Sequence, residues 1–416
     1  MQQQAGHTDV EPGLGSGGPW RARDPCNQGH ANHHGDVADE QKGQGFCVWQ
    51  TQPGANKAGG PQHDEDEREG AGEACGHGPV KYVGVTAGFC TATVPVQDCG
   101  NRIPARRTTP AFQYRYPVSQ TIPIRYVSPV FRPPSEAQSL ILPVTNGCSW
   151  NKCTYCEMYT EPQKKFQVRE EQETLDSIRR CGEQFPHQVQ RVFLGDGDAM
   201  VLSTRRLMTL LTAIKEHLPA VRRISTYCLP RNVRNKSVAE LKELRDAGLS
   251  LAYVGAESGD DEVLQKVNKG ETFESTRDAL DKLGAAGITR SVMLLNGLGG
   301  RGLSRQHAES SARLANLTQP EFLATLVVSF PQGEERFRQG FPTWEPLDQR
   351  EMFLEIELLL QNLELKRTVF RSDHASNWLA LKGTLGAEKS RLLAEVRTAI
   401  EHPQSAKLRN DWERAL

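Results

Sequence analysis

Residues 145–158 read TNGCSWNKCTYCEM and hold three cysteines within nine positions, Cys148, Cys153 and Cys156. Structural zinc sites use four ligands, and their sequences commonly present two C-x2-C pairs. This chain has one such pair, and its later cysteines are isolated from each other. A [4Fe–4S] cluster on three protein thiols keeps one iron open for a further ligand. The triplet therefore predicts a cluster with an open iron, and three buried, inert cysteines are the simpler alternative.

The composition narrows the class of protein further. The 50 Lys and Arg residues nearly cancel the 51 Asp and Glu residues, so no global basic field is expected to hold nucleic acid or an anionic membrane. No apolar run approaches the roughly 20 residues needed to span a bilayer. The start, MQQQAGHTDVEPG, lacks the charged and apolar regions of a secretory signal. We therefore expect a cytoplasmic protein whose cysteines are not paired in disulfides.

The character of the chain changes near residue 135. Residues 1–135 are rich in Gly, Pro, Gln, His and Asp and show no helical or strand periodicity, which predicts a disordered region. Its cysteines have wide, irregular spacing and are expected to be free thiols: Cys26, Cys47, Cys75, Cys90 and Cys99. The stretch from Cys99 to Pro134 has no acidic residue and several Arg. It is read as a linker, with a polyanion-binding arm or an organelle-targeting segment as alternatives.

From residue 136 on, apolar runs typical of strands alternate with amphipathic helical runs. The apolar runs cover residues 139–144, 191–195, 222–229, 250–257, 288–295 and 322–330. Strands that alternate with helices predict a parallel sheet with right-handed crossovers. Six such units favour a partial (β/α)6 TIM-like barrel over residues 136–335, with a doubly wound sheet as the alternative. Residues 336–416 are predicted to form a C-terminal helical extension that packs on the barrel.

The cysteine triplet follows the first predicted strand, and further motifs follow later strands. They are GDGDA (195–199), STYCLPR (225–231), GAESGDDEVLQKVNKG (255–270) and NGLGG (296–300). In this order the segments resemble those of the radical S-adenosylmethionine (radical SAM) superfamily over about residues 137–335. The cysteine spacing departs from the usual pattern, because the family's C-x3-C-x2-C is C-x4-C-x2-C here.

The resemblance implies one [4Fe–4S] cluster on the three cysteines, with S-adenosylmethionine on the open iron. It implies an enzyme that cleaves the cofactor reductively to a 5′-deoxyadenosyl radical, which acts on an unidentified small-molecule or peptide substrate. An external electron donor of flavodoxin or ferredoxin type would be needed. Carried onto this sequence, the cofactor-binding positions are Tyr155, Gly197, Asp198, Ser225, Glu257, Lys269 and Gly297. Glu257 would contact the ribose, and Lys269 the cofactor carboxylate. The alternative is a degenerate barrel that serves as an iron–sulfur electron-transfer or structural module without radical chemistry.

Two further residues are candidates for catalysis. SDHASN (372–377) is dense in polar groups, and His374 within it could exchange protons near neutral pH. A helix-capping turn is the simpler interpretation of that stretch. Cys228, at the end of the third predicted strand, could face the cavity as a hydrogen donor, although a small core residue fits the same position.

Overall fold

The computed structural model describes residues 122–414. Most of the N-terminal region lies outside this range. The structure therefore does not test its expected disorder, its cysteines or its alternative roles. Within the range, no helix is both long and apolar enough to cross a bilayer.

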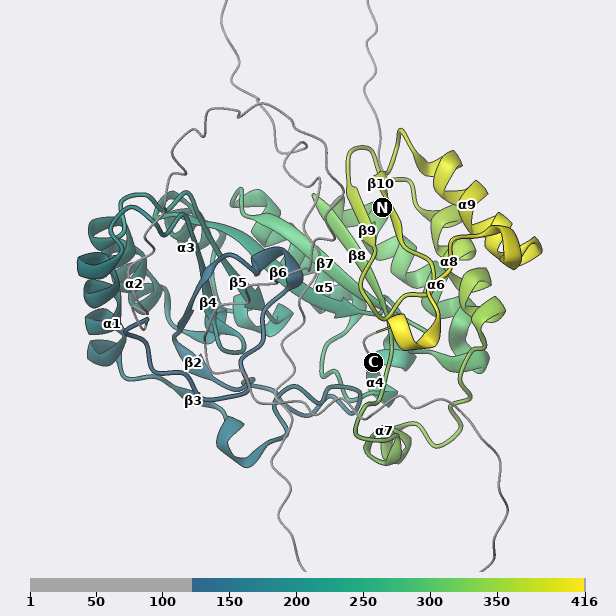
Figure 1. The fold of residues 1–416 in the computed structure, drawn as a ribbon, viewed down its shortest axis with the longest axis horizontal. Coiled ribbons are helices and arrows are strands. Elements are labelled where there is room, and N and C mark those ends of the chain that lie inside the picture. Colours follow the sequence, from purple (N-terminus) through teal and green to yellow (C-terminus); the bar gives the residue numbers. More distant parts are fainter. Residues whose placement is uncertain (1–121, 415–416) are drawn as a thin grey trace, which may run out of the picture. The chain divides into compact units, whose positions relative to one another are not determined.

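An eight-stranded sheet forms the centre of the described structure (Figure 1). Its order is β1-β4-β5-β6-β7-β8-β9-β10, and every neighbouring pair is parallel except β9 and β10. The strands are β1 (Leu140–Pro143), β4 (Arg191–Gly195), β5 (Arg223–Cys228), β6 (Leu249–Glu257), β7 (Thr289–Asn296), β8 (Phe322–Val327), β9 (Val369–Ser372) and β10 (Leu381–Thr384). A separate antiparallel pair consists of β2 (Thr145–Asn146) and β3 (Gln167–Val168). All six predicted strands are present, and the sheet stays open with β1 and β10 at its edges.

Helices connect the parallel strands and cover the outer face of the sheet (Figure 1). They are α1 (Glu171–Gln184), α2 (Thr204–His217), α3 (Val238–Asp246), α4 (Asp261–Lys266), α5 (Phe273–Ala285), α6 (Gly300–Thr318), α7 (Glu335–Gly340), α8 (Gln349–Asn362) and α9 (Lys389–Glu401). This alternation confirms the partial TIM-like barrel. The extension contains the predicted helices α8 and α9, and it also adds β9 and β10 to the sheet, which were not predicted.

Local sequence explains where the helices begin. Before α3, the Ser237 side chain accepts a hydrogen bond from the Glu240 backbone N–H, and the Glu240 carboxylate accepts one from the Ser237 N–H. This capping box satisfies N–H groups that have no partner within the helix, and such a cap contributes about 1 kcal/mol. Gly248, after the helix, has a φ of 117°, a conformation that glycine adopts without strain.

The two faces of the sheet bury different side chains. The main core lies between the sheet and the helices and includes Val192, Ile224 and Val254. The interior face carries a smaller cluster around Phe193 and Tyr253, against which Tyr227 packs. The ring centroids of Phe193 and Tyr227 are 5.1 Å apart, and Tyr253 lies 6.2 Å from each. These aromatic side chains line the interior face of the sheet.

The segment before β1 closes the barrel at the N-terminal ends of the strands. Glu136 is fully buried and accepts hydrogen bonds from the Tyr253 hydroxyl at 2.6 Å and from Arg223 at 2.8 Å. Ser135 also bonds the Tyr253 hydroxyl, at 2.7 Å. Residues 122–135, which the sequence interpretation grouped with the N-terminal region, thus contact the barrel.

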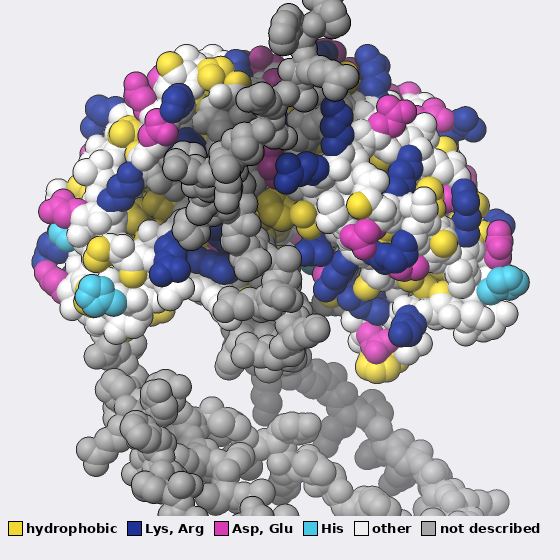
Figure 2. All heavy atoms as spheres, turned by 90° about the horizontal axis from the view of Figure 1, so that it is seen from above, with side chains coloured by type: hydrophobic (Ala, Val, Ile, Leu, Met, Phe, Trp, Pro, Cys, Tyr) yellow, Lys and Arg dark blue, Asp and Glu magenta, His cyan; other side chains and the backbone are white. Residues whose placement is uncertain are grey.

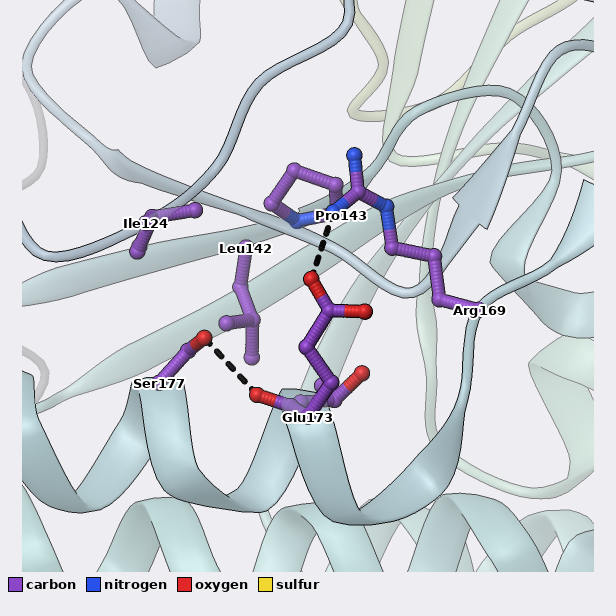
Figure 3. Close-up of a pocket in the computed structure, with 7 residues that line it drawn as sticks. Ile124, Leu142, Pro143, Arg169, Glu173 and Ser177 are labelled. Carbon is purple, nitrogen blue, oxygen red and sulfur yellow. Dashed lines mark hydrogen bonds and ion pairs between the residues drawn. The ribbon is translucent and has the colours of Figure 1, made fainter.

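A small recess lies between β1 and α1, on the outer side of the sheet (Figure 3). Leu142 and Ile124 line it, and Arg169 lies 3.9 Å from the Glu173 carboxylate above them. None of the predicted site residues lines this recess. The predicted chemistry lies in the loops that follow the strands.

Candidate functional site

The cysteine loop, residues 147–156, follows β2 and lies against segments that follow other strands. The Trp150 indole donates a 2.8 Å hydrogen bond to the Asn268 carbonyl, and the Thr154 N–H donates one of 3.0 Å to Val267. Asn151, in the four-residue spacer, has a φ of 44° and donates through its side chain to the Tyr159 carbonyl. The bonds of Trp150 and Thr154 tie the loop to the segment that precedes Lys269.

The three thiols of this loop are free, with Cys153 buried and Cys148 and Cys156 half-buried. Burial raises the pKa of Cys156 to about 12, and the thiols of Cys153 and Cys148 add to the rise. Burial also raises the pKa of Cys148, while the backbone N–H groups of Asn151 and Trp150 oppose that rise. Within residues 122–414, no three His, Cys, Asp or Glu side chains are grouped closely enough to hold a single metal ion.

The donor set fits an iron–sulfur cluster. Each cysteine ligand of a [4Fe–4S] cluster binds a different iron, so the sulfurs need not converge on one point. Backbone N–H groups already point at the sulfurs of Cys148 and Cys156, where they stabilise negative charge on sulfur. Three thiols on one loop therefore suit the cluster that the spacing predicts.

Glu257 and Lys269 form an ion pair beside the cysteine loop. The Lys269 ammonium lies 3.0 Å from Glu257 Oε1 and 3.1 Å from the Tyr155 hydroxyl. Burial lowers the pKa of Lys269, but the Glu257 carboxylate and the Cys153 thiol outweigh it, so the pKa lies above its usual value. A Cβ on Gly255 would come within 2.1 Å of the Glu257 carboxylate, so glycine makes room for this pair.

The GDGDA turn after β4 packs directly on the cysteine loop. A Cβ on Gly197 would lie 2.0 Å from the Gly147 carbonyl oxygen, and the φ of Gly197 is 118°. The buried Asp198 carboxylate accepts hydrogen bonds from the Ser149 N–H at 2.7 Å, from the Ser149 hydroxyl, and from the Asn232 amide at 2.9 Å. Burial raises the pKa of Asp198, and these hydrogen bonds oppose the rise.

Ser225 lies deeper than the other predicted positions. It pairs in register with Phe193 on β4 and Leu251 on β6, both members of the interior cluster. It is fully buried, and its hydroxyl has no hydrogen-bond partner among the described residues. Tyr227, two residues further along the same strand, lies closer to the end that carries the cysteine loop.

Gly297, after β7, is held by the C-terminal extension. Its N–H donates a 2.7 Å hydrogen bond to Glu355 on α8, and its carbonyl accepts one from the Trp344 indole at 3.2 Å. Sequence reasoning missed both partners. The available signal was Glu355 itself, an acidic residue among the buried apolar positions of α8.

His374 lies on the loop after β9, at the same end of the sheet as the other strand-end loops. The Ser376 N–H donates to His374 Nδ1 at 3.1 Å, which leaves the ring proton of the neutral form on Nε2. Burial lowers the pKa of His374. Arg409 holds the loop by donating to the carbonyls of His374, Asn377 and Asp373.

Cys228 does not face the barrel interior. Its thiol is buried in the main core on the helix side of the sheet and donates to the Leu229 carbonyl at 3.4 Å. Side chains alternate along a strand, so the neighbouring Tyr227 takes the interior position instead. The simpler interpretation of Cys228, a small core residue, fits this placement, and the structure offers no support for a role as hydrogen donor.

Residues 142–315 match the family model of the radical SAM superfamily. This part of the chain, residues 142–315, is a radical SAM domain. Members are enzymes, the family implies a [4Fe–4S] cluster and S-adenosylmethionine, and they generally need an external electron donor. The expectation of a radical SAM enzyme is thereby confirmed at the level of the family.

Individual known proteins match at low identity. The heme chaperone HemW of Bacillus subtilis is 24% identical over 169 residues, which cover 39% of this chain and 43% of HemW. The chain thus spans less than half the length of this curated relative. Coproporphyrinogen III oxidase (HemN) of Escherichia coli matches with a TM-score of 0.41 and 16% identity, over 54% of this chain and 50% of HemN. The methyltransferase TsrM of Kitasatospora setae matches with a TM-score of 0.37 and 19% identity, over 45% of this chain and 36% of TsrM.

Proposed function

We propose that this radical SAM protein is an active radical enzyme. Cys148, Cys153 and Cys156 would hold one [4Fe–4S] cluster, and Glu257 and Lys269 would hold S-adenosylmethionine beside it. A reduced cluster on these cysteines would supply the one electron that cleaves the cofactor to methionine and a 5′-deoxyadenosyl radical, which would act on the substrate. An external donor of flavodoxin or ferredoxin type would supply that electron.

The buried Lys269 ammonium is the observation that carries this proposal. Its side chain is 4% exposed and lies against Tyr155, the residue next to the last cysteine. A lysine ammonium has three donor positions, of which Tyr155 and Glu257 use two. The third is suited to a cofactor carboxylate. In the Glu257 carboxylate, Oε1 accepts a hydrogen bond from Lys269. Oε2 has no hydrogen-bond partner among the described residues, so it is suited to accept hydrogen bonds from ribose hydroxyls.

The remaining residues would complete the pocket around this pair. The backbone of Gly297 would meet the adenine, with Tyr155 beside it, and Gly197 would permit close approach to the cysteine loop. Ser225 remains a candidate from the third strand, although it lies one layer below Tyr227. His374 would present a proton on Nε2 from the loop after β9 and could donate it to the substrate, which is a small molecule or a peptide. On the face shown in Figure 2, basic and acidic side chains are interspersed, which gives no support to a nucleic-acid substrate.

The test is anaerobic reconstitution with iron and sulfide, followed by an assay for 5′-deoxyadenosine with dithionite and S-adenosylmethionine. We expect 5′-deoxyadenosine from the wild type and none from the variant with Cys148, Cys153 and Cys156 changed to Ala. Cys181→Ala, which removes a thiol outside the loop, is the matched control. A protein that holds the cluster and binds the cofactor without cleaving it would favour the electron-transfer or structural module instead.

A further inference from the structure

We propose that Asp198 is a positioning residue for the cysteine loop. By binding Ser149, it would hold the adjacent Cys148 where the cluster needs its first thiol. This inference rests on the proposed function, because the cluster is the group that the loop would position. It differs from the role of cofactor-binding residue that the resemblance implies for Asp198.

Both oxygens of Asp198 are directed at neighbouring polar groups. Oδ1 accepts from the Ser149 N–H at 2.7 Å, and Oδ2 accepts from the Ser149 hydroxyl and from the Asn232 amide at 2.9 Å. The residue is 2% exposed. An ionised carboxylate offers about four acceptor positions, so at most about one stays available for a cofactor amino group. The geometry therefore favours a role toward the loop.

The groups behind Asp198 keep the carboxylate in place. Asn232 Oδ1 accepts from the Leu229 N–H at 2.7 Å, which orients the amide that donates to Asp198. The buried Lys236 ammonium donates to the Met200 carbonyl at 2.9 Å and to the Asn232 carbonyl at 3.1 Å. Lys236 thus joins the turns that follow β4 and β5. Asp198 is supported from the body of the barrel and faces the cysteine loop.

The two ends of the cysteine loop are anchored differently. Its middle and later part are tied to the segment before Lys269 through Trp150 and Thr154. Four residues separate Cys148 from Cys153, and each residue of such a spacer costs conformational entropy when it is ordered. At the Cys148 end, both the backbone and the side chain of Ser149 donate to Asp198. We therefore expect the loss of Asp198 to free the first thiol selectively.

The experiment measures iron release to a chelator from anaerobically reconstituted protein. Substitution of residues that orient metal ligands typically lowers metal affinity by roughly 10- to 100-fold. We expect Asp198→Ala to increase the rate of iron release by a factor in that range. Ser149→Ala keeps the N–H bond and should have a smaller effect in the same direction. The Asp198→Ala/Ser149→Ala double variant should release iron no faster than Asp198→Ala alone, because both remove the same contact. Cys181→Ala, which removes a thiol outside the loop, should leave the release rate unchanged.

Amide hydrogen exchange on metal-free protein tests the same contact without a cluster. We expect faster exchange in the peptide that covers residues 145–150 for Asp198→Ala, and a smaller increase for the conservative Asp198→Asn, which keeps one acceptor. Exchange in α5 reports whether either variant has lost its fold. Unchanged exchange and unchanged iron release, with weakened cofactor binding, would overturn the proposal in favour of a cofactor ligand. A wild type that takes up no cluster would instead refute the proposed function, and the exchange result would still decide the role of Asp198.

Discussion

The Glu355 carboxylate on α8 accepts a 2.7 Å hydrogen bond from the backbone N–H of Gly297, in the loop after β7. Its other oxygen accepts from the Ser304 hydroxyl at 2.6 Å. His307 lies 4.0 Å from the same carboxylate and bonds Ser258, the residue after Glu257, at 2.8 Å. A buried polar network therefore joins the loops after β6 and β7 to the C-terminal extension.

This network connects α8 to the candidate site, so substitutions in α8 should affect the binding of S-adenosylmethionine. Glu355→Ala leaves the buried Gly297 N–H without an acceptor, which costs about 1–3 kcal/mol. We expect that loss in the free energy of unfolding, measured with denaturant, together with weaker binding of S-adenosylmethionine. Glu355→Gln retains an acceptor and should lose less on both measures. Equal losses in the two variants would contradict a role for the hydrogen bond to Gly297.

Each of the three cysteines should be required separately for full iron content. Because each cysteine would bind a different iron, Cys148→Ala, Cys153→Ala and Cys156→Ala should each lower the iron content after reconstitution. Cys181→Ala should retain the wild-type content, since Cys181 is a buried residue of α1 and lies outside the loop. Iron content and visible absorption measure the result. Full iron in the triple variant would exclude this loop as the cluster site.

Glu257 and Lys269 should act on the cofactor and not on iron. A hydrogen bond to a buried charge is worth about 1.5–3 kcal/mol, so Glu257→Ala or Lys269→Ala should weaken S-adenosylmethionine binding by roughly 10- to 100-fold. A binding titration on reconstituted protein measures this, with iron content followed in parallel. Loss of iron together with affinity would show that the pair holds the barrel together.

The same ion pair makes a separate prediction for stability. Removing one partner of a buried ion pair costs about 3–5 kcal/mol, because the other charge is left uncompensated. Glu257 is 12% exposed, so we expect Lys269→Met to cost somewhat less than that range. The Glu257→Gln/Lys269→Met double variant should unfold at higher denaturant than Lys269→Met alone. A double variant that is less stable would indicate that the two side chains contribute independently.

His374 should make stability depend on pH in a defined direction. Burial lowers its pKa in the folded state below the ordinary value of 6.5, so the unfolded state binds more protons as the pH falls. The contribution of His374 to the free energy of unfolding is therefore fully present above pH 6.5. It is lost as the pH falls from the ordinary pKa toward the lower pKa of the folded state. His374→Gln should lack this decrease, whereas Gln in its place can still accept from the Ser376 N–H. Unfolding curves across this pH range that run parallel for both proteins would contradict the assignment.

The local sequence pattern was sufficient to predict the order of the strands and helices and the loops that carry the candidate site. The six apolar runs and the helices between them follow from periodicity, which each segment carries within itself. The cysteine triplet and the GAESGDDEVLQKVNKG segment are also local, because the twelve-residue spacing of Glu257 and Lys269 brings them together over one short helix. The resemblance to the radical SAM superfamily rests on such local segments in their order.

The tertiary structure alone decided which distant groups meet. Asp198 and Ser149 are 49 positions apart, and Gly297 and Glu355 are 58 apart, so no spacing rule could pair them. The strands β9 and β10 are only four residues long, too short to show a period, and they form because an open sheet edge at β8 needs a hydrogen-bonding partner. Cys228 faces the helices because the register of β5 directs the neighbouring Tyr227 into the barrel. Sequence determines what a short segment can become, whereas contacts across the fold depend on how the chain closes on itself.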